Sequence, residues 1–572
     1  MAANRQVTVQ AGELVNQGAQ IGSVQGDAQI GTVTAELDNG NGGRIEAKGK
    51  VTVAAQGLIN RGGEIVASSI ELDTKTKDLD NSAGKIVATG TQMGAVAEIA
   101  SGALDNDQGL IQAASALSIN TNGQSLTNTG SGENNGIIGE STVTLDTGNI
   151  TNQTGYIGSK ETLELMGQTV DNTQSGILLS HAQMRLMADA LDNRGGQIQS
   201  LGALTVELGA GQLDNTASLI RSAADAQIVA GTVLNNDTAG QDKGLEAASL
   251  NVAVAQRLDN TAGVIRSDER LVLAVGDSIN NTDGVIASKN NTVSLADRDL
   301  SNKSLDINNR DGTLIAGTDV EINVAALSGD GTVLSDGDID IALTDTYTHT
   351  GQLYAEGNAK LDTMGDIEHR SVLAANESLE LTASTINTRA ASELKAGRVT
   401  LTATGTNTLN HRGLIDGNST EINAVTLNNV KTGRIYGDHV SISAATVNNK
   451  EKNGKAPIIA ARNRLDIAAQ TINNIDHALI FSAGDLAIGG MLDAERHATG
   501  QAGKLNNRSA TVEALGHVDL SAAVVNNVND YITTEVVKLV RRNVVRYQLN
   551  PKFHHRPGDE ILDLIDIEQH SS

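Results

Sequence analysis

Hydrophobic and polar positions repeat along the first half of the chain in a short phrase: an aliphatic residue, any residue, asparagine, and then small and polar residues. In the copy at residues 191–208, the last five positions read Leu-Thr-Val-Glu-Leu, and glycines stand at 195, 196 and 202. Alternation with a period of two is typical of a half-buried strand, and the glycines mark turns. Each copy therefore predicts about three short strands separated by tight turns, and no helix.

The asparagine of this phrase recurs on average every 22 residues. It stands at Asn16, Asn39, Asn60, Asn81, Asn106, Asn128, Asn152, Asn172, Asn193, Asn215, Asn236, Asn260, Asn281 and Asn302. Strands too short to bury a face alone, repeated at this period, predict an all-β solenoid, most consistently a right-handed parallel β-helix. Coils in register stack at roughly 4.8 Å, so the asparagines can form a hydrogen-bonded ladder, while the aliphatic residue two positions earlier stacks in the core. About 25 such coils make a rod on the order of 120 Å long.

The repeat changes after Asn302. Residues 303–306 break the register, and the phrase restarts with Ile307-Asn308-Asn309. Its third position then varies before a paired Asn-Asn form returns at residues 428–429. We therefore predict three regions: a regular stalk at 1–302, a divergent β-helix with loop insertions such as 450–457 at 303–530, and a non-repeat tail at 531–572. The mixed periodicity of residues 536–549 leaves both helix and strand open there.

Composition fits a thin, repetitive core. The 572 residues include two phenylalanines, six tyrosines and no tryptophan, whereas compact cores obtain much of their buried area from aromatic side chains. A narrow interior repeated in every coil has room for Ile, Val, Leu and Ala but little room for rings. Five of the six tyrosines and both phenylalanines lie after residue 346. Aromatic side chains are therefore almost absent from the stalk and concentrated in the later part of the chain.

Charge and missing motifs exclude several classes of protein. The formal net charge of −26 argues against binding to nucleic acid or to anionic membranes. The absence of cysteine excludes disulfides and thiolate metal sites. No apolar run is long enough to span a membrane, and residues 1–5 lack the apolar stretch of a signal peptide. No cofactor is indicated, since the chain has no Walker, Rossmann, H-E-x-x-H or G-x-S-x-G motif.

Copies such as Leu-Asp-Asn-Arg-Gly-Gly-Gln-Ile at residues 191–198 resemble the haemagglutinin repeats of the filamentous haemagglutinin and CdiA exoproteins. The resemblance is strong over residues 5–302 and weaker over 303–530. It implies a secreted filament of the bacterial cell surface, exported by an outer-membrane two-partner-secretion transporter, of which this chain is an internal piece. In the contact-dependent growth inhibition branch, the resemblance further implies a repeat stalk, then a receptor-binding region, then a Tyr/Pro-containing segment and a delivered toxin. The order of regions here is similar, although the tail is too short to test the last step.

We accordingly expect a protein that is not an enzyme and that presents residues 303–530 to an outer-membrane receptor of a neighbouring bacterium, either a protein or lipopolysaccharide. An adhesin for host cells or biofilm partners is the alternative. A polysaccharide-active β-helix enzyme is disfavoured, because nothing in the sequence places two carboxylates in one cleft and the aromatic platforms of sugar sites are scarce.

Candidate receptor contacts are tyrosines and lysines of the divergent region. Tyrosine is enriched at binding hot spots, although each one could instead fill the core. The lysines form a local basic loop in an acidic protein and could meet phosphates or an acidic partner, although ordinary loop charge explains them equally well. These candidates are Tyr347, Tyr354, Tyr436, Lys450, Lys452 and Lys455.

Histidines and aspartates of the same region have two interpretations. Two of the histidines His349, His369, His411 and His439 stand 20 residues apart at the ladder position, which favours substitution for asparagine over metal binding or pH sensing. The alternating Asp336, Asp338 and Asp340 could offer oxygens to Ca²⁺, but a solvated strand face is the simpler interpretation. We predict no metal site.

Overall fold

The computed structural model describes residues 1–92, 94–132 and 134–537. The chain divides into two units, Met1–Val528 and Asn529–Ser572. In the second unit, residues 529–537 contain no strand or helix, and most of the predicted tail lies outside the described residues. No helix long and apolar enough to cross a membrane occurs in the described ranges.

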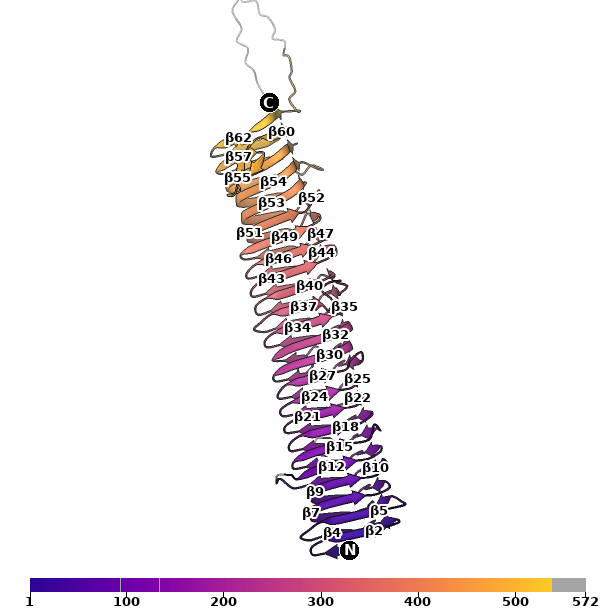
Figure 1. Cartoon of the computed structure of the whole chain (residues 1–572). Coiled ribbons are helices and arrows are strands. Elements are labelled where there is room, and N and C mark those ends of the chain that lie inside the picture. Colours follow the sequence, from indigo (N-terminus) through magenta and orange to yellow (C-terminus); the bar gives the residue numbers. More distant parts are fainter. Residues whose placement is uncertain (93, 133, 538–572) are drawn as a thin grey trace, which may run out of the picture. The chain divides into compact units, whose positions relative to one another are not determined.

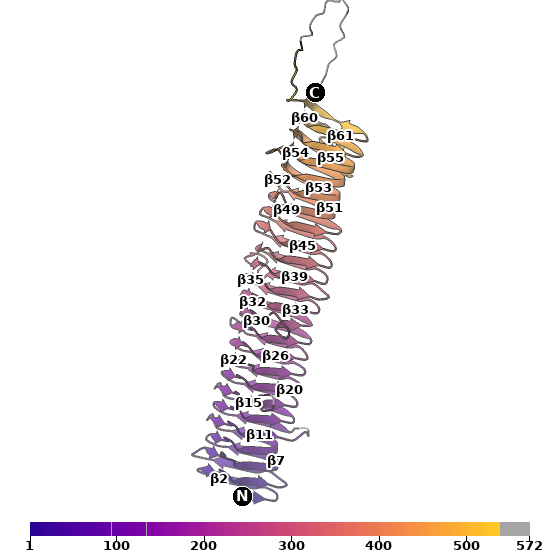
Figure 2. The same ribbon diagram turned by 180° about the vertical axis from the view of Figure 1, so that it is seen from behind.

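The first unit is a parallel β-solenoid of about 25 turns spaced roughly 21 residues apart, and its described residues contain no helix. Coils stack from β2 at one end to β62 at the other (Figure 1), and the view from behind shows the same stack (Figure 2). The predicted parallel β-helix is therefore confirmed. Each coil contributes one strand to each of three faces, which we call the first, second and third sheets in chain order after the ladder asparagine.

The first sheet consists of short strands that alternate buried and half-buried side chains. They are β1 (Ala2–Ala3), β4 (Gln20–Ser23), β11 (Lys85–Ala88), β14 (Leu110–Ala113), β17 (Gly136–Gly139), β20 (Tyr156–Ser159), β23 (Ile177–Ser180), β26 (Gln197–Ser200), β29 (Leu219–Ser222), β31 (Gly244–Ala247), β33 (Val264–Ser267), β36 (Val285–Ser288), β39 (Thr313–Ala316), β42 (Thr332–Ser335), β45 (Gln352–Ala355), β48 (Val372–Ala375), β56 (Leu479–Ser482) and β61 (Thr511–Ala514).

The second sheet follows after a tight turn in each coil. Its strands are β2 (Val7–Ala11), β5 (Ala28–Thr32), β12 (Val96–Ala100), β15 (Ala116–Asn120), β18 (Val143–Asp146), β21 (Leu163–Met166), β24 (Met184–Met187), β27 (Leu204–Glu207), β34 (Leu271–Val275), β37 (Val293–Asp297), β40 (Val320–Val324), β43 (Ile339–Leu343), β46 (Ala359–Thr363), β49 (Ser378–Ala383), β57 (Asp485–Gly489) and β62 (Val518–Leu520).

Most strands of the third sheet are only two or three residues long, and the ladder residue stands at or close to the end of each. They are β3 (Leu14–Val15), β6 (Leu37–Asp38), β8 (Leu58–Ile59), β10 (Leu79–Asp80), β13 (Leu104–Asp105), β16 (Leu126–Thr127), β19 (Ile150–Thr151), β22 (Thr169–Asp171), β25 (Ala190–Asp192), β28 (Gln212–Asp214), β35 (Ser278–Asn280), β38 (Asp306–Asn308), β41 (Ala326–Ser328), β44 (Tyr347–His349), β47 (Ile367–His369), β50 (Ile386–Thr388), β52 (Thr408–His411), β60 (Ala502–Arg508) and β63 (Ala522–Val528).

Longer strands continue around a corner from one sheet into the next. They are β7 (Arg44–Ala54), β9 (Glu64–Asp73), β30 (Asp225–Leu234), β32 (Ser249–Asp259), β51 (Glu393–Ala403), β53 (Leu414–Val430), β54 (Arg434–Lys450) and β55 (Ile458–Ile475). The last three run through all three sheets, so the coils they form are the most continuously paired part of the solenoid. The loop predicted at residues 450–457 separates β54 from β55.

The interior of the solenoid is a stack of aliphatic side chains, because equivalent positions of successive coils come into register. In the third sheet, for example, Val170 pairs with Leu191 and Leu191 with Leu213, and all three are almost fully buried. Each such residue contributes roughly 1.5–3 kcal/mol of hydrophobic free energy.

Buried asparagines form a ladder at the corner after the third sheet. Each side-chain Nδ2 donates to the Oδ1 of the next coil over 2.6–2.9 Å, and most also donate to a backbone carbonyl. The series runs through Asn16, Asn39, Asn60, Asn81, Asn106, Asn128, Asn152, Asn172, Asn193, Asn215, Asn235, Asn260, Asn281 and Asn309.

Two members of the predicted ladder were misplaced. Asn235 is the ladder residue instead of Asn236, because the buried Val233 two positions earlier fills the core slot. Asn309 replaces Asn302, which is exposed, because Leu300 is 59% exposed whereas Ile307 is buried. The buried aliphatic residue thus decides which asparagine enters the ladder.

Asp297 at the end of β37 explains the break in register. Its buried carboxylate accepts hydrogen bonds from the backbone N–H groups of Asp299 at 2.8 Å, Leu305 at 2.7 Å and Ser304. These bonds close residues 298–305 into a loop before the next coil begins.

Asp297→Ala is expected to open this loop and destabilise the adjoining coils by about 3 kcal/mol, since a charged acceptor of three backbone donors is lost. Limited proteolysis and hydrogen exchange of residues 298–305 measure the opening. Asp299→Ala, which removes an exposed carboxylate of the same loop, is the control. Equal protection in Asp297→Ala and wild type would contradict this role.

After β38 the ladder position takes other side chains. Gly329 comes first, then His349, His369, Thr388 and His411 occupy it in turn, and asparagine returns at Asn429. Three buried histidines therefore take the place of asparagine at the ladder position, as the sequence predicted. His349 and His369 stack with ring centroids 5.1 Å apart.

The paired Asn-Asn coils carry two ladders with opposite direction. The buried one donates toward the C-terminus from Asn429 to Asn449 at 2.9 Å, whereas the outer one donates toward the N-terminus from Asn448 to Asn428 at 2.8 Å. Each coil in this part of the solenoid thus gains a second amide contact with its neighbour.

A hairpin that the sequence did not predict interrupts the last coils. Its strands β58 (Met491–Leu492) and β59 (Ala498–Thr499) are antiparallel, and they lie between β57 and β60. The hairpin folds back over the outer face of the second sheet, where its contacts are described below.

Candidate binding surface

The outward aromatic side chains of the divergent region gather in one row of the first sheet. Strand register aligns Tyr354 with Ala374, Lys395, Asp416, Tyr436, Ala460 and Phe481 in successive coils. We call these seven residues the aromatic row. Tyr354, Tyr436 and Phe481 are each half-buried, so each side chain is partly accessible to solvent on the outer face of the sheet.

Three aliphatic residues and one arginine, each two positions earlier, extend the same surface. Register aligns Leu414, Arg434, Ile458 and Leu479, and each is half-buried. Side chains at i and i+2 of a strand lie on the same face, so these residues flank Tyr436 and Phe481. The face of β53–β56 therefore combines apolar and aromatic side chains with two charged ones, Asp416 and Arg434.

Charged groups border this face and are paired with each other. Arg462 bridges Asp416 at 2.9 Å and Asp438 at 3.0 Å. The Tyr354 hydroxyl donates at 3.0 Å to Asn376 Oδ1 or at 3.1 Å to Glu356. These contacts hold the polar rim in place around the rings.

The basic loop joins the face at the start of β55. Lys450, Lys452 and Lys455 are exposed, and Arg434 of β54 donates from Nη1 to the Ala456 carbonyl at 3.0 Å. Because Arg434 precedes Tyr436 by two residues, the lysines lie at the edge of the surface that carries Tyr436.

Tyr347 does not belong to this surface, and its prediction as a contact was wrong. It lies in β44 of the third sheet at the position of Ile367 in the next coil, is 5% exposed, and burial raises its pKa. Phe481 was missed, although its place in the alternating strand Leu479–Ser482 puts it outward. Tyr354, Tyr436 and the three lysines lie at the surface.

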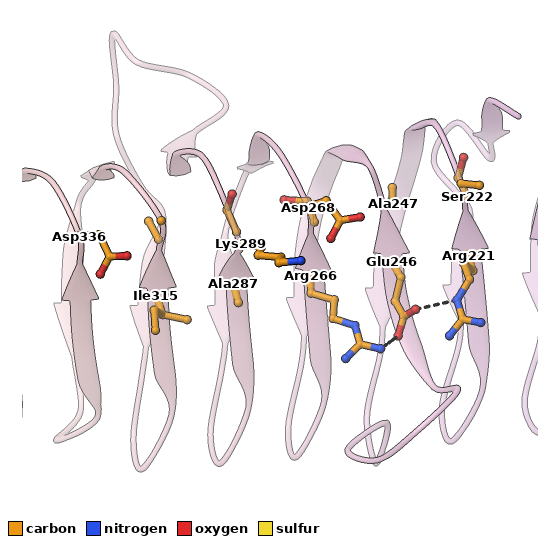
Figure 3. Close-up of a pocket in the computed structure, with 15 residues that line it drawn as sticks. Arg221, Ser222, Glu246, Ala247, Arg266, Asp268, Ala287, Lys289, Ile315 and Asp336 are labelled. Carbon is orange, nitrogen blue, oxygen red and sulfur yellow. Dashed lines mark hydrogen bonds and ion pairs between the residues drawn. The ribbon is translucent and has the colours of Figure 1, made fainter. Parts of the chain in front are cut away.

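The same row of the first sheet forms a groove of about 790 Å³ farther toward the N-terminus (Figure 3). Its floor is lined by small residues such as Ala223, Ala247 and Ala316. Figure 3 shows Glu246 between Arg221 and Arg266; the Arg221 Nε contact is 2.7 Å. Glu246 is 9% exposed, whereas Arg221 is half-buried and Arg266 is exposed, so a buried carboxylate is paired with two arginines that reach solvent. No aromatic residue lines the groove.

The hairpin is held on the second sheet by buried ionic contacts. Asp466, fully buried, accepts from His439 Nε2 at 2.9 Å, Arg464 Nε at 2.7 Å and the Ala498 N–H at 2.8 Å. Burial alone would raise the pKa of Asp466, but these hydrogen bonds outweigh it and lower the pKa. His439 is thus part of a structural contact.

Arg496 at the hairpin turn extends this attachment to β53. Its guanidinium lies 3.0 Å from Asn423 Oδ1 and 3.3 Å from Glu421 Oε2. The carboxylates beneath the hairpin are all paired with cations. Among the residues that the structure describes, no group of three or more His, Asp or Glu side chains could hold a metal ion.

Comparison with known proteins gives two matches. A family model described as "Haemagglutinin repeat" matches residues 2–32, 319–371 and 444–541. More of this match falls after residue 302 than before it, the reverse of the strength expected from the sequence. "Deoxyribonuclease CdiA" from Dickeya dadantii (strain 3937) is 26% identical over 450 residues, which cover 73% of this chain and 13% of that protein. No solved structure matches.

Proposed function

Since this chain is of the filamentous haemagglutinin and CdiA type, a secreted filament protein of the bacterial cell surface, we propose that it holds a receptor-binding region away from the producing cell. Residues 1–302 are the stalk and 303–530 the receptor-binding region. The receptor belongs to the outer membrane of a neighbouring bacterium, and binding precedes contact-dependent delivery of a toxin. Export by a two-partner-secretion transporter belongs to the same proposal.

The observation that carries this proposal is the aromatic row. The whole chain has only eight Phe and Tyr residues, yet Tyr354, Tyr436 and Phe481 align on one outward face. Aromatic side chains bury large areas on binding and are enriched at binding hot spots, so partly exposed rings on a paired sheet suit a contact surface. The adjacent lysines supply attraction to an acidic partner, protein or lipopolysaccharide.

The length of the solenoid separates the receptor-binding region from the producing cell. About 25 coils stacked at roughly 4.8 Å make a rod on the order of 120 Å long, and strand pairing joins successive coils, with ladder side chains linking most of those in the stalk. The protein does no chemistry in this proposal. The word deoxyribonuclease describes the Dickeya protein, of which this chain covers a small part.

Replacing Tyr436 and Phe481 together by alanine is expected to weaken binding to susceptible bacteria at least 30-fold, because loss of a hot-spot ring costs about 2 kcal/mol or more. Titration of fluorescently labelled full chain on susceptible and receptor-deleted strains measures the affinity. Tyr156→Ala, an aromatic truncation on the same sheet within the stalk, is the matched control.

Unchanged binding by the double variant, with unchanged circular dichroism, would exclude the aromatic row as the receptor contact. Binding to host cells but not to bacteria would favour the adhesin alternative. The 790 Å³ groove is the place to examine for the polysaccharide-enzyme alternative, and release of reducing sugar by the full chain would support it.

A further inference from the structure

The asparagine ladder loses its side chain at Gly329. Asn308 pairs with Ser328, so Gly329 stands in the coil after Asn309 at the ladder position. Its φ is +102°, and a Cβ atom there would lie 2.4 Å from the Arg310 nitrogen. No side chain therefore fits, and Asn309 has no amide oxygen in the next coil to which it can donate.

A small cavity occupies this position. It is lined by Asn309, Gly329, Tyr347 and His349 among others and has a volume of about 10 Å³. That is about the room that one water molecule needs, and a polar cavity of this size requires at least two polar partners to hold it. The cavity lies between the last asparagine of the ladder and the first histidine.

His349 lines the cavity, and one of its ring nitrogens lacks a hydrogen-bond partner in the described part of the chain. The side chain is 2% exposed, and its Nε2 has no hydrogen-bond partner among the described residues. A buried polar atom without a partner destabilises the fold, so a partner that satisfies it stabilises the fold.

The neighbouring contacts determine which protonation state His349 has. His369 Nε2 lies 3.0 Å from the Glu393 carbonyl, which only accepts, so in the neutral ring Nε2 carries the proton and His369 Nδ1 accepts. His349 Nδ1 lies 3.0 Å from His369 Nδ1 and therefore donates. The neutral ring of His349 then has a lone pair at Nε2, which requires a donor.

Asn309 has the complementary group. In each preceding coil the Asn Nδ2 donates to the next ladder residue, as Asn281 does to Asn309 at 2.7 Å. Asn309 Nδ2 instead has one long contact, 3.4 Å to the Thr332 carbonyl. A donor with an N–H to spare and an acceptor without a partner thus border the same cavity.

We propose that one buried water molecule binds in this cavity, accepts a hydrogen bond from Asn309 Nδ2 and donates one to His349 Nε2. The water takes the place of the missing ladder side chain. It joins the asparagine ladder to the histidine pair, and the hydrogen bonds then run with one polarity from Asn16 to the Glu393 carbonyl.

The test uses the full chain. A crystal structure at 1.8 Å or better is expected to show a density peak within hydrogen-bond distance of both Asn309 Nδ2 and His349 Nε2. Nuclear magnetic resonance of ¹⁵N-histidine-labelled protein is expected to show His349 protonated at Nδ1 and a cross-peak between its ring and a long-lived water.

His349→Gln should remove that cross-peak, whereas His411→Gln, at a ladder position whose Nε2 already contacts the Arg434 carbonyl, should retain it. An empty cavity in the crystal, protonation of His349 at Nε2, or a cross-peak that persists in His349→Gln would each overturn the proposal. The wild-type density keeps the test valid even if a variant fails to fold.

Discussion

Asn235→Ala is expected to destabilise the solenoid by about 3–5 kcal/mol, whereas Asn236→Ala, one residue away, is expected to cost about 1 kcal/mol. Asn235 is fully buried; its side chain accepts from Asn215 at 2.9 Å and donates to Asn260 at 2.8 Å and the Val264 carbonyl at 2.9 Å. Truncation leaves a cavity and several buried groups without partners.

Asn236 has the same side chain as Asn235 but lies outside the ladder. It is half-buried, and its Oδ1 accepts only from the Thr261 N–H at 3.0 Å. The two variants make the same substitution at adjacent positions, and they differ in ladder membership together with the burial and hydrogen bonds that it brings, so Asn236→Ala is the control.

Local measurement is needed, because each coil contacts only its neighbours and a long solenoid does not unfold as one unit. Hydrogen exchange of residues 212–267 should rise 100-fold or more in Asn235→Ala and much less in Asn236→Ala. Equal effects of the two substitutions would mean that the ladder adds nothing beyond ordinary burial.

Acidification from pH 7 to pH 5 is expected to loosen the coils around residues 347–411. Burial lowers the pKa of His369 and His411 to about 4, and burial together with the neighbouring His369 lowers that of His349 to about 3. An imidazole in the unfolded chain has a pKa of about 6.5, so the unfolded state binds more protons between these values.

Stability is therefore fully present above about pH 6.5 and falls as the pH drops toward 4. At pH 5, each histidine with a folded pKa of about 4 has lost about 2 kcal/mol of stabilisation. Hydrogen exchange of residues 347–430, corrected for the intrinsic effect of pH, measures this loss coil by coil.

The variant His369→Asn/His411→Asn should reduce the acid effect, because asparagine carries no proton in this range. His181→Asn, which replaces an exposed histidine, should leave it unchanged. If the double variant loosens between pH 7 and pH 5 as much as wild type does, the carboxylates are responsible and the histidine account is wrong.

Much of the architecture follows from the repeat. The phrase places an aliphatic residue and an asparagine at the same point of every coil, and parallel stacking brings equal points together at a fixed spacing. The ladder through Asn193 and the aliphatic stack through Leu191 follow from this local periodicity.

The errors occur where two candidates fit the same phrase. Val233 and Leu234 both precede an asparagine by two residues, and Tyr347 could either point outward or occupy the aliphatic position. Choosing between them requires knowledge of which side chain the neighbouring coils bury. The phrase Tyr347-Thr348-His349 did contain the signal, since Tyr347 stands where Leu and Ile stand in other copies.

The sequence by itself determined that this protein is a parallel β-solenoid with a buried asparagine ladder, because both depend on a period that is visible along the chain. Only the tertiary structure decided which aromatic rings share an outward row, how the hairpin attaches to coils up to 73 residues away, and where the ladder lacks a side chain. These features depend on register and burial between coils, and local sequence patterns do not report either one.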